Sequence, residues 1–277
     1  MKQIFMILFY WLMLLGSIAN AETQNIQIEV GGVKIDVQAP IGFHEISSLS
    51  PETRNLAETM TPPSNRLLAI FVSEDDLGRI MKGEVPKFGR YMLLQVFREL
   101  ENTNISNGQF RQLVAQIKAQ QNTLPKEYEL SQKMKIGEHV PLGVFFEQSN
   151  AIGFASLVKY QAEAEGEKLD YVVAGGTSFI RVKQKVLYAY VYGTYENQDD
   201  LNWVRSKSRE WVNSLLTFNN TSTTSSGSTY RSSSSSEIGD KLISKGISGA
   251  IGGILIALLI GVFQGAKRLF KKRKDDV

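Results

Sequence analysis

Side chains suited to catalysis are few in this sequence and far apart. Ser156-Leu-Val-Lys159 fits the S-x-x-K letters of the penicillin-binding class of serine nucleophiles. In that class the motif starts a helix, so serine and lysine share a face. Here it falls in an expected strand, where a spacing of three places the two side chains on opposite faces. No G-x-S-x-G, phosphate-cradling G-x-x-x-x-G-K or dinucleotide-binding glycine pattern occurs, so we expect no catalytic residue and no cofactor site.

The sequence also contains no pattern that predicts metal binding or thiol chemistry. His44 and His139 are the only histidines, and neither belongs to a recognisable ligand pattern, so we expect surface or loop histidines and no metal site. The chain has no cysteine, which excludes cysteine nucleophiles, disulfides and cysteine zinc sites. The acidic runs 74–76 and 199–200 are expected to complement helix N-termini rather than to bind cations.

One row of aromatic side chains is a candidate binding face. Tyr188, Tyr190 and Tyr192 alternate along one side of an expected strand. Basic side chains alternate in the same manner just before it, at Arg181, Lys183 and Lys185. An exposed tyrosine row stacks on a ligand or a protein partner. The alternative is ordinary cross-strand packing beneath a helix.

Hydrophobic periodicity and turn residues predict the elements that position these side chains. A hairpin is expected over 26–37 around Gly31-Gly32, and a capping box at Ser106 starts an amphipathic helix that runs to about Asn122. Further helices are expected at 50–60, at 74–82 and from Asp199 or Asp200 onward, the last with an apolar stripe of Leu201, Val204, Trp211, Leu215 and Leu216. Further strands are expected at 66–72, 91–100, 130–136, 143–149, 151–162, 169–183 and 186–195, with a bulge or bend at 175–178.

This order of elements predicts an α+β fold in which helices cover an antiparallel sheet. Residues 22–218 are enough for one such domain with its own core.

Both ends of the chain look like membrane-targeting segments. Residues 1–21 resemble a secretory signal, with Lys2, an apolar run of 12 residues from Ile4 and Ala19-Asn20-Ala21 as the cleavage site. An uncleaved N-terminal anchor is the alternative. Residues 246–266 contain no charged residue, and about 20 apolar residues suffice for a helix to cross a bilayer. The basic tail 267–277 marks the cytoplasmic side of this expected transmembrane helix.

Two segments connect the domain to this helix. In residues 219–236, 13 of 18 are serine or threonine, which predicts a flexible linker. Residues 237–245 form a short juxtamembrane segment.

The expected transmembrane helix has a ridge of small residues at four-residue spacing, formed by Gly249, Gly253, Ala257, Gly261 and Gly265. Such a ridge lets two helices approach closely, so we expect a homodimer or a membrane-protein partner there. Glycine is also common in membrane helices generally. The basic residues of the tail are expected to stop transfer and to contact lipid headgroups, namely Lys267, Arg268, Lys271, Lys272, Arg273 and Lys274.

The net charge of +3 is unevenly distributed. The tail contributes +4, while Lys2 and the segment 219–245 contribute +1 each, so residues 22–218 carry −3. A mildly acidic domain without a basic stripe is not expected to bind nucleic acid.

The step Ala39-Pro40-Ile41-Gly42-Phe43 after the first strands, with the order of elements that follows, resembles the PsbP/Mog1-like α-β-α sandwich family. That resemblance implies a non-catalytic accessory or binding module with no transferable active-site residues. The whole layout is similar to that of single-span envelope proteins of Gram-negative bacteria.

These observations favour a protein of the bacterial inner membrane, with its domain in the periplasm and its C-terminus in the cytoplasm, that serves as an accessory or protein-interaction module. An envelope enzyme with a site assembled from scattered polar residues is one alternative. A eukaryotic type I surface protein is another, because Asn104, Asn219 and Asn220 stand in glycosylation sequons.

Overall fold

The computed structural model describes residues 24–49, 54, 58, 61–82, 84, 86–120, 128–131, 134–164 and 167–220. The expected signal segment 1–21, the linker from residue 221, the juxtamembrane segment 237–245, the transmembrane segment 246–266 with its small-residue ridge, and the basic tail lie outside these ranges. No helix within the described ranges has the length and apolar character that crossing a bilayer requires.

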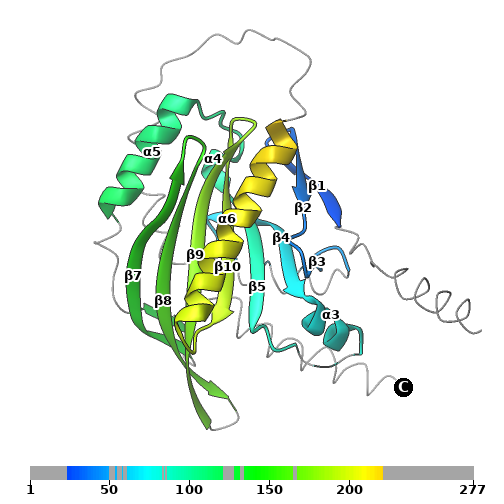
Figure 1. The fold of residues 1–277 in the computed structure, drawn as a ribbon, viewed down its shortest axis with the longest axis vertical. Helices are drawn as coiled ribbons and strands as arrows, with labels where there is room; N and C mark the ends of the chain where they lie inside the picture. Colours follow the sequence, from blue (N-terminus) through cyan, green and yellow to red (C-terminus); the bar gives the residue numbers. More distant parts are fainter. Residues whose placement is uncertain are drawn as a thin grey trace, which may run out of the picture.

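An eight-stranded antiparallel sheet forms the centre of the molecule, in the order β3-β4-β5-β10-β9-β8-β7-β6 (Figure 1). Helices cover this sheet, so the α+β architecture expected from the sequence is confirmed. The strands are β3 (Phe43–Glu45), β4 (Asn65–Ser73), β5 (Arg90–Phe97), β6 (Tyr128–Ser131), β7 (Met134–Gln148), β8 (Ala151–Ala164), β9 (Glu167–Val182) and β10 (Lys185–Thr194).

A separate hairpin packs against one face of this sheet. It consists of β1 (Asn25–Val30) and β2 (Val33–Gln38), as expected, joined by Gly31 and Gly32 with φ angles of 53° and 76°. Two successive positive φ angles make the primed turn that suits the twist of a hairpin, and glycine adopts them without a steric penalty.

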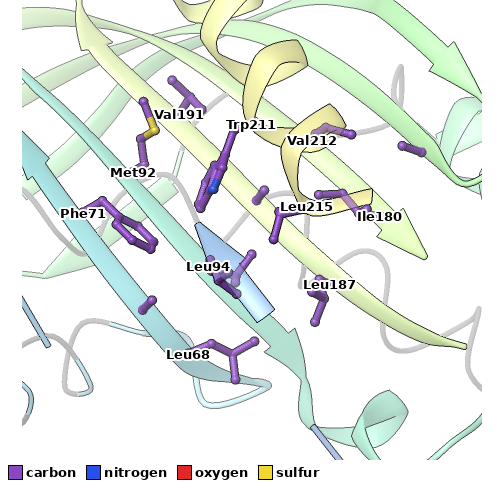
Figure 2. Packing of buried hydrophobic residues seen from close by; sticks show 14 of the residues in the cluster. Leu68, Phe71, Met92, Leu94, Ile180, Leu187, Val191, Trp211, Val212 and Leu215 are labelled. Atoms are coloured by element: carbon purple, nitrogen blue, oxygen red, sulfur yellow. The ribbon is translucent and has the colours of Figure 1, made fainter. Parts of the chain in front are cut away.

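The two faces of the sheet carry different covers. Helix α6 (Gln198–Asn220) and the β1–β2 hairpin cover what we call the α6 face, while α5 (Asn107–Gln120) and α3 (Glu74–Met81) contribute to the other, the α5 face. Figure 2 shows side chains of α6 above the sheet, where Trp211 meets Phe71 edge to face at 5.3 Å between ring centroids. The body is therefore layered, with an apolar core on each side of the sheet.

Helix α6 lies close to the sheet because the strands beneath it carry small residues. A Cβ atom added at Gly176 would overlap the Ser208 hydroxyl and lie 3.0 Å from Val204 Cγ1. The bulge or bend expected at 175–178 is wrong, since β9 keeps an unbroken register with both neighbouring strands through this stretch. Glycine is required here for the approach of the helix and not for a change of strand direction.

The expected break between strands 130–136 and 143–149 is also wrong, because β7 runs through it. Gly137, Pro141 and Gly143 resemble breakers, but the ladder with β8 absorbs them in register shifts near residues 136–138 and 141–144. Bulges of this kind bend a strand without ending it. His139 therefore lies in a strand rather than in a loop.

The remaining elements follow the sequence closely, with shifted ends. Strand β5 ends at Phe97, and α4 (Arg98–Glu101) occupies the rest of the expected strand. The capping box at Ser106 is confirmed, because its hydroxyl accepts from Gln109 N and its N–H donates to the Gln109 side chain. Of the helix expected over 50–60, Arg54 and Glu58 are described, both helical and 3.1 Å apart in an ion pair.

Helix α6 begins before the aspartates that were expected to cap it. The Asn197 side chain accepts from Asp199 N at 2.8 Å and takes the capping position. Asp200 instead turns back and accepts from the N–H groups of Glu196 and Asn197, at 3.0 and 3.2 Å. These bonds, led by the one from Glu196, lower the pKa of Asp200.

Replacing Gly176 with alanine tests the close contact between α6 and β9. We expect Gly176→Ala to lower the free energy of unfolding by about 1–3 kcal/mol, because the new methyl group overpacks the interface. Adding Ser208→Ala should restore part of the loss, since it removes the nearest atom. The measurement is urea unfolding followed by tryptophan fluorescence.

Gly78→Ala is the matched control for this prediction. Gly78 lies in α3 with nothing within 4 Å of an added Cβ, so alanine should stabilise the helix by about 0.5–1 kcal/mol. Equal losses of stability in the two alanine variants would contradict the packing explanation.

Candidate functional site

The tyrosine row does not form a binding face on the surface. Tyr188, Tyr190 and Tyr192 have exposed fractions of 2%, 0% and 0% and lie in the core of the α5 face. Their rings stack in parallel along β10, with centroids 6.4 and 6.1 Å apart. The cross-strand packing alternative therefore describes the row, and burial raises the pKa of Tyr188 and of Tyr190.

The other candidate side chains are not brought together. His44 lies in β3 and His139 in β7, six strand positions apart in the sheet, or roughly 29 Å at the usual strand spacing. Burial lowers the pKa of His139. Ser156 and Lys159 project from opposite faces of β8, as expected, since the β8–β9 register is unbroken between them. Among the described residues, no group of His, Asp and Glu side chains is arranged to hold a metal ion.

Charged side chains from distant segments meet at one end of the sheet instead. The turn of the β1–β2 hairpin, the turn between β9 and β10, and α4 lie together there. We call this group of side chains the hairpin-end cluster. It is defined by position, on the β1–β2 hairpin, at the start of β4, on α4 or around the turn between β9 and β10, and it contains the basic residues Lys34, Arg66, Arg98, Arg181, Lys183 and Lys185 and the acidic residues Glu29, Asp36, Glu99 and Glu101.

Lys185 is the most deeply buried charge of the cluster. Its side chain is 2% exposed, and its ammonium group donates to the main-chain carbonyls of Glu101 at 3.1 Å and Thr103 at 3.5 Å. Burial lowers the pKa of Lys185, and the nearby Glu101 carboxylate opposes that shift. The side chain thus holds the start of β10 against the end of α4.

Glu101 joins three segments of the chain. Its carboxylate accepts from Arg66 Nη2 at 2.5 Å and from Arg66 Nε at 3.2 Å, while Arg66 also donates to the Glu29 carbonyl at 2.8 Å. A Cβ atom added at Gly31 would overlap the Glu101 carbonyl oxygen and lie 2.7 Å from Lys185 Nζ. The hydrogen bond from Arg66 is the main cause of the lowered pKa of Glu101. Glycine at the hairpin turn is therefore needed for space as well as for its positive φ.

Two further cations fasten the turn between β9 and β10. Arg181 donates to the Ile105 carbonyl at 2.6 Å, and Lys183 donates to the Lys34 carbonyl at 2.9 Å. Lys183 also lies 3.7 Å from the Asp36 carboxylate. The alternating basic residues seen in the sequence therefore bond to three different segments, namely the loop at Ile105, strand β2 and the end of α4.

The C-terminal end of α6 reaches the same end of the molecule. Asn219 is 2% exposed, and its amide group donates to the Asp36 carbonyl at 2.8 Å and accepts from Asp36 N at 3.1 Å. The side chain thus bonds to β2 much as a neighbouring strand does. Helix α6 extends to Asn220, two residues beyond the expected boundary at 218. Because both atoms of the Asn219 amide are engaged, this sequon is a poor glycan acceptor, whereas Asn104 is exposed.

The opposite end of the sheet, which we call the far end, has a different character. Arg90 lies 4.4 Å from the ring centroid of Trp203 and 3.6 Å from Asp200. The buried Asp76 carboxylate accepts from the N–H groups of Lys87 and Phe88, at 2.6 and 3.1 Å. Met81, at the end of α3, is 74% exposed.

Sequence reasoning missed the hairpin-end cluster because its members lie up to about 150 positions apart in the chain. Alternation in Arg181, Lys183 and Lys185 was the one available signal. It did not reveal the partners, which are main-chain carbonyls of β2, of α4 and of the loop after α4.

No protein-family model and no curated protein matches this sequence. Among solved structures, the chain is similar to the crystal structure of the Ran-binding protein Mog1p of Saccharomyces cerevisiae. The identity is 16%, the match covers 70% of this chain and 100% of that chain, and the TM-score is 0.30. At these values the likeness carries no argument about activity or partners, and the architecture is taken from the described strands and helices.

The pKa of Glu101 leads to a prediction about acid stability. Because its folded-state pKa lies below 4.5, the carboxylate stabilises the fold at higher pH, and this contribution is lost as the pH falls through the folded pKa. We expect Glu101→Gln to cost about 1–3 kcal/mol at pH 7, and the deficit to shrink below pH 4.5. Thermal unfolding across pH 3–7 measures it.

Glu99→Gln is the control for this prediction, because it removes the same charge from α4 while Arg66 keeps its partner. A deficit in Glu101→Gln that stays constant down to pH 3 would show that the carboxylate charge is not the cause.

Proposed function

We propose that this protein is a membrane-tethered accessory or protein-interaction module without catalytic activity, held in a bacterial inner membrane with its folded body in the periplasm. We include in this proposal that the body is a PsbP/Mog1-like α-β-α sandwich. Helices on both faces of one antiparallel sheet support that assignment.

The observation that carries the proposal is the way the body ends. Helix α6 is fixed to the hairpin by Asn219, and the chain continues from Asn220 directly into the Ser/Thr-rich segment and the apolar segment 246–266. A domain on a tether stays folded when its last helix is bonded to the rest of the body and a polar linker follows. The Asn219 bonds of α6 and the Ser/Thr-rich segment fit this description.

The charged and aromatic side chains that the sequence singled out support a binding role rather than catalysis. The charges of the hairpin-end cluster that are buried or half-buried bond to carbonyls and carboxylates of the fold. The tyrosine row packs inside the core. These groups stabilise the body. Partner binding is therefore assigned to other surface residues or to the apolar segment 246–266.

Membrane integration and orientation are tested together on the full chain. We expect carbonate washing to leave the protein in the membrane pellet, and protease added to intact spheroplasts to remove the body while sparing a short C-terminal fragment. Release of full-length chains by carbonate, or full protection of the body, would contradict the proposal.

Association through the small-residue ridge is tested by cross-linking in native membranes. Gly253→Ile should abolish the cross-linked dimer or partner complex, because the added side chain separates the helix backbones. Leu255→Ile, about 200° away on the helix, is the control and should leave cross-linking intact. Unchanged cross-links in Gly253→Ile would remove the ridge from the proposal.

A further inference from the structure

We propose that the hairpin end of the body docks on anionic lipid headgroups of the bilayer that holds the chain, so that the far end points away from the membrane. The inference rests on the membrane tether of the proposed function. It concerns the periplasmic surface of the bilayer, whereas the basic tail 267–277 was expected to meet the cytoplasmic one.

Charge is distributed asymmetrically along the sheet. The hairpin-end cluster has six basic and four acidic residues, a net charge of +2, although the domain 22–218 as a whole carries −3. The part of the far end formed by α3, by the segment between α3 and β5 and by the segment between β10 and α6 shows the opposite balance, with seven acidic residues against four basic ones. These are Glu74, Asp75, Asp76, Glu84, Glu196, Asp199 and Asp200, and Arg79, Lys82, Lys87 and Arg90.

The register of the strands places the two groups at opposite ends. Strand β5 runs from Arg90 at the far end to Phe97, next to α4 and the cluster. Strand β10 runs from Lys185 in the cluster to Thr194, whose N–H bonds to Gly89 at the far end. Eight to ten residues of strand separate them by roughly 26–33 Å, which is several Debye lengths of about 8–10 Å at physiological salt. The two ends therefore respond separately to a charged surface.

Several cations of the hairpin-end cluster are accessible to a membrane surface. Lys34 and Arg98 are exposed, as are Glu29 and Glu99. The side chains of Arg66 and Lys183 keep 30% and 21% of their surface accessible, beside 21% and 40% for their partners Glu101 and Asp36. Lys185 is buried and adds to the positive potential without touching a headgroup. Exposed basic side chains near a bilayer are attracted by anionic lipids, and buried ones reinforce that field.

The last residues of α6 lie at the hairpin end of the body. Asn219 is bonded to Asp36, so the linker starts beside the cluster, where α6 ends next to the β1–β2 hairpin (Figure 1). Residues 221–236, expected from the sequence to form a flexible linker, are 16 residues that would span about 20–24 Å root-mean-square. That length allows the hairpin end to reach the bilayer without strain, and it brings this end nearer to the surface than the far end.

The absence of cysteine allows a single fluorophore to be placed at either end of the full chain. The labelling sites are Asn102→Cys and Met81→Cys. Asn102 is exposed at the end of α4, and Met81 is 74% exposed at the far end. The labelled protein is reconstituted in nanodiscs of phosphatidylcholine, alone or with phosphatidylglycerol, that carry an energy acceptor on the headgroups. We expect phosphatidylglycerol to raise energy transfer from position 102 at least twofold and to leave position 81 nearly unchanged.

Added salt and substitutions of charged residues test why energy transfer differs between positions 102 and 81. In 0.5 M NaCl the increase at position 102 should disappear, because salt screens the attraction. Lys34→Gln with Arg98→Gln should lower the ratio of docked to undocked body roughly tenfold or more, given the attraction expected of each basic residue. The matched control is Lys82→Gln with Lys87→Gln, which removes two exposed positive charges from the far end and should have no effect.

The outcomes separate the inference from the proposed function. Equal energy transfer from both positions, or an increase that survives high salt, would overturn docking by the hairpin end even if the protein is firmly integrated. Failure of the full chain to enter nanodiscs would overturn the tether itself. The salt test uses the unchanged cluster, so it decides the matter even if the double variant does not fold.

Discussion

The arrangement of one whole end of the molecule depends on the buried ammonium group of Lys185. Removing an ammonium group from water is costly unless polar partners replace the water, and here two main-chain carbonyls do so. Those carbonyls belong to Glu101 and Thr103, at the end of α4, where backbone acceptors have no helical partner. Lysine and helix end therefore satisfy each other, and Glu101 then holds Arg66 and leaves room for the hairpin turn only because residue 31 is glycine.

The two faces of the sheet solve the packing problem in different ways. On the α6 face, Gly176 lets the helix approach until Ser208 and Val204 touch the strand. On the α5 face, large rings fill the space, with Phe179 and Tyr188 in edge contact at 4.9 Å. The two faces of one strand can therefore carry residues of opposite size, as in β9, where Gly176 and Phe179 face opposite layers. The distribution of small and large residues determines how near each cover lies.

Much of the fold could be predicted from the sequence because periodicity and turn chemistry are local. The Gly31-Gly32 hairpin and the capping box at Ser106 each depend on a few adjacent residues. The course of β7 could not be predicted, because only pairing with β8 shows that Pro141 and Gly143 sit in bulges rather than in a loop. Turn residues mark a local conformation, and the partner strand decides whether the strand ends there.

The burial of the tyrosine row was also missed, although the sequence of β10 contained a signal for it. Alternation predicts which side chains of a strand share a face but not whether that face is covered. Strand β10 lies in the interior of the sheet order and is apolar on both sides from Val186 to Val191, which is typical of a strand buried on both faces. Polar phenol groups made one side resemble a surface.

The hairpin-end cluster could not be found from composition, because the domain as a whole is acidic. A net charge averages over the surface, whereas a surface potential depends on which residues the fold places within a Debye length of one another. Lys34 and Lys183 are 149 positions apart in the chain and are joined by one hydrogen bond in the structure. A tether holds one part of a domain close to the membrane. The charge near the point of attachment therefore affects the orientation of the domain more than its total net charge does. In the proposed tethered protein that point lies at the end of α6, where Asn219 bonds to Asp36 in the hairpin-end cluster.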